Sequence, residues 1–264
     1  MSRSINKGQL ERLYALYNRQ EYVHPDPLEF LYRYRDPLDR EIVGLISSSL
    51  AYGQVSQIIK SVQLVLGRMP SPRDFLLRSS LKSLRHALAQ FRHRFTSGHE
   101  LACMLFGAGR ILKRYGSLNE CFRKGMGRRD GSVIPALSAF VAKMNQASGV
   151  QLGYLLPSPE NGSACKRPNL FLRWMVRRDD VDPGGWRGIS SSKLIVPLDT
   201  HMHKISLALG LTRRRQGDMR TALEITQAFR RFSPQDPAKY DFALTRLGIR
   251  KDVDFGPLLG PTRA

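Results

Sequence analysis

IVPLDTHMHKISLALGL, at residues 195–211, contains the clearest helix start in the chain. A short apolar run reaches Pro197, and Asp199 follows where a helix should begin. Apolar residues then recur at helical spacing, at Met202, Ile205 and Leu209. Asp is a preferred N-cap, because its carboxylate accepts the free N–H groups of the first helical turn. Asp199 is therefore expected at the mouth of a buried helix, where capping alone would explain its presence.

Helical spacing of apolar residues also runs through the rest of the chain. Asp36-Pro37 opens the strongest further segment, which breaks near Gly53 and then resumes. A last helix is expected to be opened by Asp236-Pro237. There is no sustained alternation of the strand type and no repeat at a fixed period. The sequence therefore predicts an all-α fold.

Two short tracts carry expectations of their own. FRHRF, at residues 91–95, places Phe91 and Phe95 at i and i+4, which is the spacing of core residues on one helix face. GMGRRDG, at residues 125–131, is rich in glycine and arginine and is the best candidate for a domain boundary.

The charge balance points to a polyanionic partner. The 264 residues include 42 Lys and Arg against 22 Asp and Glu, a formal net charge of +20, and the hydrophobic content of 42% is typical of a globular chain. Nucleic acid is the commonest polyanion for such a protein, although solvated basic helix faces are the alternative. Paired or tripled arginines suit phosphate groups, and they occur at 177–178, 213–215 and 230–231.

Other features exclude several classes of protein. No apolar run approaches the length of a membrane span, and the first residues contain no apolar stretch of the signal-peptide type, so no membrane partner is expected. Three scattered cysteines are too few for a zinc site, an iron–sulfur cluster or a disulfide framework. We therefore expect no metal, no cofactor, free thiols and a cytoplasmic location.

Lys166 is the candidate nucleophile. It lies at the start of the helix that precedes the irregular stretch leading to Asp199, and Leu170 and Trp174 follow it at intervals of four. An amine in apolar surroundings at the positive end of a helix is disfavoured in its ammonium form and can act as a nucleophile. The alternative is a surface lysine whose stem packs along Trp174.

Further candidates surround these two residues. Arg167 and the free N–H groups of the same first turn could hold a phosphate. Tyr52 and Gln54 lie in the corner SSSLAYGQ between two expected helices and could wedge into a duplex, although a packed Tyr and a turn Gln are the simpler interpretation. His201 and His203 flank Asp199 and would either pack or contact phosphate.

The order of these motifs resembles the helix-hairpin-helix (HhH-GPD) DNA glycosylases of base excision repair. The matching residues are Leu156-Pro157, Lys166, Val196-Pro197-Leu198-Asp199-Thr200-His201 and Leu209-Gly210-Leu211. The resemblance is good over roughly residues 130–250 and only architectural over 36–125. The pattern LPSPENGSACK replaces the usual glycine-rich hairpin, and an insertion with Asp182 and Trp186 lengthens the spacing between Lys166 and Asp199. These departures are most similar to archaeal 8-oxoguanine glycosylases, within a poorly characterised bacterial branch.

The resemblance implies a fold of two helical subdomains with a cleft between them. Residues 36–125 would form a central subdomain, residues 1–35 plus 126–250 a second one with the hairpin-like turn and the catalytic pair, and residues 251–264 a tail. Lys166 would be the attacking lysine and Asp199 the essential aspartate. Contacts to DNA would come from Arg167, His201, His203, Lys204, Tyr52 and Gln54.

The function implied is that of a nucleoid-associated, monomeric DNA glycosylase with AP-lyase activity. Its partner would be double-stranded DNA with a base lesion or an abasic site, and an oxidised purine is the leading substrate. A carboxylate can stabilise the positive charge that builds on the sugar, and an amine can displace the base, once the base has been flipped out of the duplex. Two alternatives stay open: a catalytically inactive DNA-binding or damage-sensing protein of this fold, and an RNA-binding protein.

Overall fold

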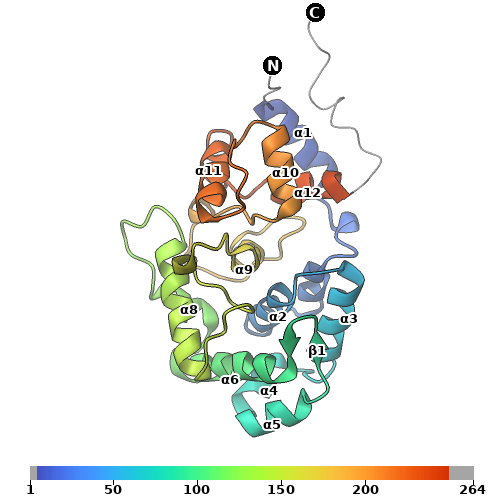
Figure 1. Ribbon diagram of the computed structural model, residues 1–264, viewed down its shortest axis with the longest axis vertical. Coiled ribbons are helices and arrows are strands. Elements are labelled where there is room, and N and C mark those ends of the chain that lie inside the picture. Colours follow the sequence, from blue (N-terminus) through green and yellow to red (C-terminus); the bar gives the residue numbers. More distant parts are fainter. Residues whose placement is uncertain (1–4, 250–264) are drawn as a thin grey trace, which may run out of the picture.

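The protein is all-α, as the sequence predicts. The computed structural model describes residues 5–249, and the only strands in that range are β1 (Arg92–His93) and β2 (Thr96–Ser97), which form a small antiparallel hairpin (Figure 1). The predicted tail at 251–264 lies outside the described residues. The longer helices are α1 (Lys7–Tyr17), α2 (Pro37–Ser49), α3 (Val55–Leu66), α6 (Gly98–Tyr115), α8 (Ile134–Ser148), α9 (Lys166–Val176), α10 (Thr200–Ala208), α11 (Met219–Arg230) and α12 (Asp241–Ile249).

Shorter helical elements connect the longer helices. The α-helices among them are α4 (Pro72–Arg78), α5 (Leu81–Ala87) and α7 (Leu118–Arg123). The 3-10 helices are η1 (Gln20–Tyr22), η2 (Pro27–Arg33), η3 (Pro159–Asn161) and η4 (Ser191–Lys193). Within residues 5–249, no helix is both long enough and apolar enough to cross a membrane.

Aspartate N-caps set several of the helix starts. Asp36 accepts the backbone N–H of Leu38 at 2.9 Å, directly before Pro37 opens α2. Asp218 caps α11 in the same way, through the N–H of Thr221 at 2.9 Å. The expected start at Asp236-Pro237 is wrong, because α12 begins at Asp241. Asp236 instead pairs with the buried guanidinium of Arg177.

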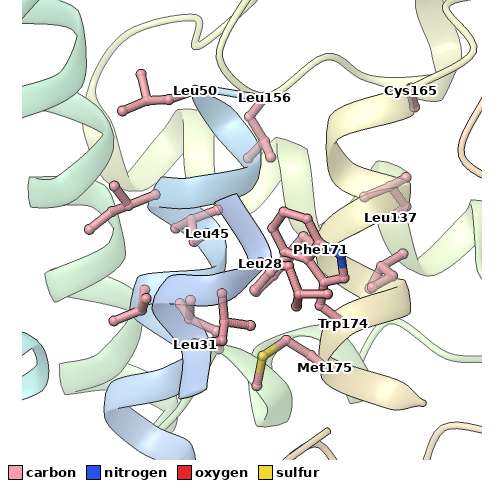
Figure 2. Close-up of a cluster of buried hydrophobic side chains, with 14 of the residues drawn as sticks. Leu28, Leu31, Leu45, Leu50, Leu137, Leu156, Cys165, Phe171, Trp174 and Met175 are labelled. Carbon is pink, nitrogen blue, oxygen red and sulfur yellow. The ribbon is translucent and has the colours of Figure 1, made fainter. Parts of the chain in front are cut away.

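Helix α9 runs through the centre of the molecule. Helices α1, α10, α11 and α12 lie at the end near both termini, while α4, α5 and α6 lie at the opposite end and α8 packs along α6 (Figure 1). Figure 2 shows side chains of η2, α2 and α9 interlocking in the core, among them Leu28, Leu45, Phe171 and Trp174. A division into residues 36–125 and the rest stays a prediction. The consequence for the site is that α9 is packed into the core against α2.

The stretch between α9 and α10 contributes a buried side chain to the core. Trp186 is buried against Phe171, and its indole N–H donates to Glu41 at 2.8 Å. Glu41 also accepts the backbone N–H groups of Leu118 and Asn119 at the start of α7, at 2.7 and 3.0 Å. Burial raises the pKa of Glu41 to about 7 despite these three donors.

Two expectations about side chains are wrong. Residues 92–97 form a hairpin rather than a helix, so Phe91 is buried while Phe95, at the hairpin tip, is 70% exposed. Arg177 was expected to suit a phosphate, but it is buried and paired with Asp179, Asp182 and Asp236. Helical spacing predicts neither result, because both depend on tight turns and, for Asp236, on a partner far along the chain.

Candidate functional site

A cleft of about 460 Å³ lies where η2, the α2–α3 corner, α9, α10 and α12 meet. Its volume is in the range of small-molecule sites. The residues that line it are Pro25, Asp26, Pro27, Ala51, Gly53, Val55, Ile58, Lys166, Leu170, Arg173, Trp174, Pro197, Asp199, His201, Asp241, Phe242, Thr245 and Arg246. Segments from residues 25–58 and 166–246 therefore build one concave surface.

Lys166 and Asp199 face each other in this cleft. Lys166 is the first residue of α9 and its Nζ lies 3.9 Å from Oδ2 of Asp199. The same Nζ donates to the carbonyl oxygen of Ala51 at 3.3 Å. The side chains are 29% and 31% exposed, so a ligand in the cleft can reach both. Both residues therefore line the same cleft.

The two oxygens of Asp199 have separate partners. Oδ1 accepts the backbone N–H groups of His201 and Met202, each at 2.9 Å, and thereby caps α10. Oδ2 is left to face Lys166. Capping thus fixes the direction of the carboxylate, because rotating it out of the cleft would break both backbone hydrogen bonds.

The surroundings of Lys166 differ from the apolar setting expected for it. Its stem does lie beside Leu170 and Trp174 in the wall of the cleft. However, a carboxylate and a carbonyl oxygen lie beside the amine, and a third of the side chain is exposed. These oxygens belong to residues 33 positions later and 115 positions earlier in the chain, so the helical spacing of residues 166–174 could not reveal them.

The floor of the cleft contains a second carboxylate that the sequence did not single out. Asp241 is buried, and its Oδ2 pairs with Nη1 of Arg173. Burial raises the pKa of Asp241 to about 6, against the opposing charge of Arg173. Beside it, Arg246 pairs with Asp26 through Nη2 and Oδ2. No local motif marks Asp241, which is simply the first residue of α12.

The other predicted site residues are distributed differently. His201 is exposed and lines the cleft. His203 turns away, with Nε2 at 2.8 Å from the carbonyl oxygen of Arg214. Lys204 is exposed but does not line the cleft, and Gln54 is an exposed N-cap of α3 without a side-chain capping bond. Only His201 of these four therefore adjoins the Lys166–Asp199 pair.

Tyr52 is packed, which is the simpler of its two expected roles. Its hydroxyl donates at 2.7 Å to the carbonyl oxygen of His93, and Thr96 Oγ1 lies at the same distance. Arg167 stacks on it, with Cζ 5.1 Å from the ring centroid of Tyr52 and 4.1 Å from that of Tyr154. The guanidinium is thereby held between aromatic rings.

An exposed aromatic platform, formed by Phe95, Tyr154 and the stacked Arg167, adjoins the cleft. Phe95 and Tyr154 are 70% and 48% exposed, and their rings meet edge to face at 5.9 Å. Arg94 lies over Gly53, which lines the cleft and has a φ of +93°. A Cβ at Gly53 would lie 2.6 Å from Cδ of Arg94, so this glycine lets the hairpin approach. The tract FRHRF was the only sign of the platform in the sequence.

None of the three cysteines lines the cleft. Cys103, Cys121 and Cys165 are free and buried. Across residues 5–249, no group of three or more His, Cys, Asp and Glu side chains is arranged to hold a metal ion. The functional groups of the cleft are therefore an amine, carboxylates, guanidinium groups, an indole and an imidazole.

Comparison with protein families corrects the resemblance drawn from the sequence. The family model that matches the chain covers residues 26–250 and is described as a protein of unknown function (DUF2400). It is not the HhH-GPD family, so that assignment is wrong. The physical reason is that an aspartate-capped amphipathic helix is a common local structure, and its motif is short. Curated proteins and solved structures give no significant match. Because the family model spans most of the chain, this protein belongs to the DUF2400 family of unknown function.

Proposed function

We propose that this protein is a DNA glycosylase with AP-lyase activity, which removes a damaged base from duplex DNA. The observation that carries the proposal is the distance of 3.9 Å between an amine and a carboxylate in an accessible cleft. The carboxylate is held in place by two backbone hydrogen bonds, so its geometry exists before any substrate binds.

The chemistry assigns one role to each member of the pair. The deprotonated Nζ of Lys166 would form a bond to the anomeric carbon while the bond from that carbon to the base breaks. The base leaves with the electron pair, and the proton lost by the nitrogen can pass to it by way of Asp199. The carboxylate also stabilises the positive charge that develops on the sugar. The sugar ring then opens to a Schiff base, and loss of a proton from C2′ expels the 3′ phosphate.

The surroundings of the cleft support double-stranded DNA as the partner. A net charge of +20 favours phosphate binding, and the aromatic platform places stackable rings beside the cleft. A base must leave the helix to reach Lys166, and Phe95 is the exposed ring that could fill the gap it leaves. An oxidised purine is the first substrate to test. A monomeric, cytoplasmic and nucleoid-associated enzyme would follow from this partner.

A second candidate is a damage-sensing protein that binds the same DNA without turnover. The hydrogen bond from Lys166 Nζ to the carbonyl oxygen of Ala51 favours it, because an amine held by two oxygens is a weaker nucleophile. Both candidates predict binding that weakens steeply as salt increases, whereas only the enzyme forms a covalent adduct.

Borohydride trapping separates the two. We expect the protein to form a covalent adduct with duplexes that carry an abasic site or 8-oxoguanine, since borohydride reduces the Schiff base to a stable amine. Lys166→Ala should abolish the adduct, and Asp199→Asn should bind DNA but lose base release. Lys82→Ala is the matched control, because it removes an exposed lysine that lies outside the cleft.

The outcomes are decisive for the lyase assignment. If the wild-type protein gives no adduct with either duplex, the damage-sensing function is favoured. If Lys166→Ala traps as well as the wild type, another amine is responsible and the assignment to this pair is wrong. A binding affinity that does not respond to salt would exclude both candidates.

A further inference from the structure

Two buried polar atoms in the floor of the cleft have no hydrogen-bond partner. They are Oδ1 of Asp241 and Nε1 of Trp174, and both side chains are at most 3% exposed. Both residues line the cleft. Buried polar groups in native proteins are almost always hydrogen-bonded, because an unpaired one costs free energy. Two such atoms in one cleft wall therefore require an explanation.

The chemistry of the two atoms is complementary. Oδ2 of Asp241 faces the guanidinium of Arg173, which leaves Oδ1 as an acceptor. The indole N–H of Trp174 can only donate. Neither side chain can rotate freely, because Trp174 is packed in the core (Figure 2) and Asp241 is paired with Arg173. Both atoms have almost no accessible surface, so a ligand can pair with this acceptor and this donor only if the wall of the cleft opens.

The cleft also selects the shape of what can approach these atoms. Leu170 and Phe242 contribute apolar surface, and the entrance holds Lys166 and Asp199. A ligand that reaches the floor while bonded to a sugar at the entrance would be a flat heterocycle. Such a heterocycle pairs with the floor if one edge carries an N–H donor next to an acceptor.

We propose that Asp241 and Trp174 recognise the edge of the flipped nucleobase, with Asp241 accepting an N–H and Trp174 donating to the neighbouring oxygen or nitrogen. This inference rests on the proposed function, which supplies the nucleobase. 8-Oxoguanine fits, because it carries N7–H beside O8, whereas undamaged guanine has a bare N7 at that edge. The two residues are positioned for specificity, not for the bond-breaking step.

The test separates base recognition from sugar chemistry. Trp174→Phe removes the donor and Asp241→Asn changes the acceptor, and each keeps most of the side-chain volume. We expect both to release 8-oxoguanine about 10- to 100-fold more slowly than the wild type, the effect of one lost hydrogen bond in a buried site. Borohydride trapping on an abasic duplex, which contains no base to recognise, should stay within about twofold.

Trp186→Phe is the matched control, since it removes a buried indole N–H that donates to Glu41 outside the cleft. It should leave both rates unchanged. A second test uses only the wild-type protein. Methylation of 8-oxoguanine at N7 or at N1 removes one N–H. At least one of these two methylated bases should be released about 10-fold more slowly than 8-oxoguanine.

Three results would overturn the inference. In the first, Trp174→Phe and Asp241→Asn both release the base at the wild-type rate. In the second, both variants lose abasic trapping and base release to the same extent. In the third, the wild type releases the two methylated bases as fast as 8-oxoguanine. If the wild type traps no abasic site, the proposed function fails by itself. Binding of free 8-oxoguanine, weakened by Trp174→Phe but not by Trp186→Phe, would then still support the inference, and no binding would refute it.

Discussion

The two ends of helix α9 hold ion pairs of opposite character. At the N-terminal end, Lys166 and Asp199 lie 3.9 Å apart, with about a third of each side chain exposed. At the C-terminal end, the buried Arg173 lies 3.1 Å from Asp182, and the buried Arg177, which follows the last residue of α9, pairs with the same carboxylate. Arg177 also holds Asp179 and Asp236 at 2.7 and 2.9 Å. One helix thus carries a loose, accessible pair and a saturated, inaccessible network.

The difference in burial and pairing indicates what the charges at each end of α9 can do. Burial alone would lower the pKa values of Arg173 and Arg177, but the surrounding aspartates outweigh it and raise both. These guanidinium groups are therefore permanently charged, and their hydrogen-bonding capacity is used by partners inside the protein. Lys166 has a single carboxylate at long range and room for a ligand. Chemistry is favoured at the end of the helix where charge is not fully satisfied.

Asp241 connects the two ends. It pairs with Arg173 in the network and lines the cleft with Lys166. Through this residue the buried network fixes the floor of the cleft, in the way that a rigid supporting shell positions a reactive group.

Breaking the network should give the largest effect. Asp182→Ala removes one of the two buried carboxylates that pair with Arg173 and the only fully buried one that pairs with Arg177, and we expect a loss of about 3–5 kcal/mol in the free energy of unfolding. Chemical denaturation monitored by circular dichroism measures this loss. The control is Asp180→Ala, an exposed aspartate two positions away, which should change stability by less than about 0.5 kcal/mol. Equal stability of the two variants would show that the network is not structural.

The residue shared by both ends should give a pH effect of intermediate size. Burial raises the pKa of Asp241 to about 6, with Asp182 and Asp199 acting in the same direction and Arg173 against it. Since Oδ2 faces Arg173, a proton would sit on Oδ1 and turn the acceptor into a donor. Base release should then fall about tenfold per pH unit below 6.

The control for this prediction is Asp241→Asn. Its amide presents the same donor at every pH, so base release should be slow and lack the step near pH 6. The measurement is the single-turnover rate of base release between pH 5 and pH 8. A wild-type rate that stays constant down to pH 5 would contradict the role of the Asp241 carboxylate.

The sequence predicted those parts of the site that depend on neighbouring residues. Asp199 and Lys166 were both placed at helix starts, because capping and apolar spacing are local properties. The all-α class followed from the same spacing. The corner at Gly53 was also expected, although its contact with Arg94 was not. In each case the information lies within a few turns of the residue.

What could not be predicted depends on contacts between distant segments or on the geometry of tight turns. Asp241 reaches Arg173 across 68 positions, and nothing near residue 241 indicates a cleft. Arg177 looked like a phosphate ligand because its three aspartates lie in a loop and a turn of unknown geometry. Phe95 looked buried because a tight hairpin, and not a helix, turns it outward. The family assignment failed for a related reason, since a short capped-helix motif does not identify a whole fold.

Substitutions in the Lys166–Asp199 pair should have the smallest effect on stability. They separate the role of Asp199 as a helix cap from its role in the reaction. Asp199→Ala removes the acceptor of two backbone N–H groups and should cost about 1 kcal/mol in the free energy of unfolding. Asp199→Asn keeps a capping oxygen, and Lys166→Gln removes only a partly exposed pair, so each should change stability by less than about 0.5 kcal/mol.

Thermal and denaturant unfolding measure these three variants side by side with borohydride trapping. One outcome is that Asp199→Asn and Lys166→Gln both preserve stability and abolish the adduct. In that case the carboxylate charge and the amine act in the reaction, and the capping hydrogen bonds only orient the carboxylate. A loss of several kcal/mol on Lys166→Gln would instead place this end of α9 in the same structural class as Arg173 and Arg177. The contrast between the two ends of the helix would then disappear, and with it the reason for assigning the reaction to Lys166.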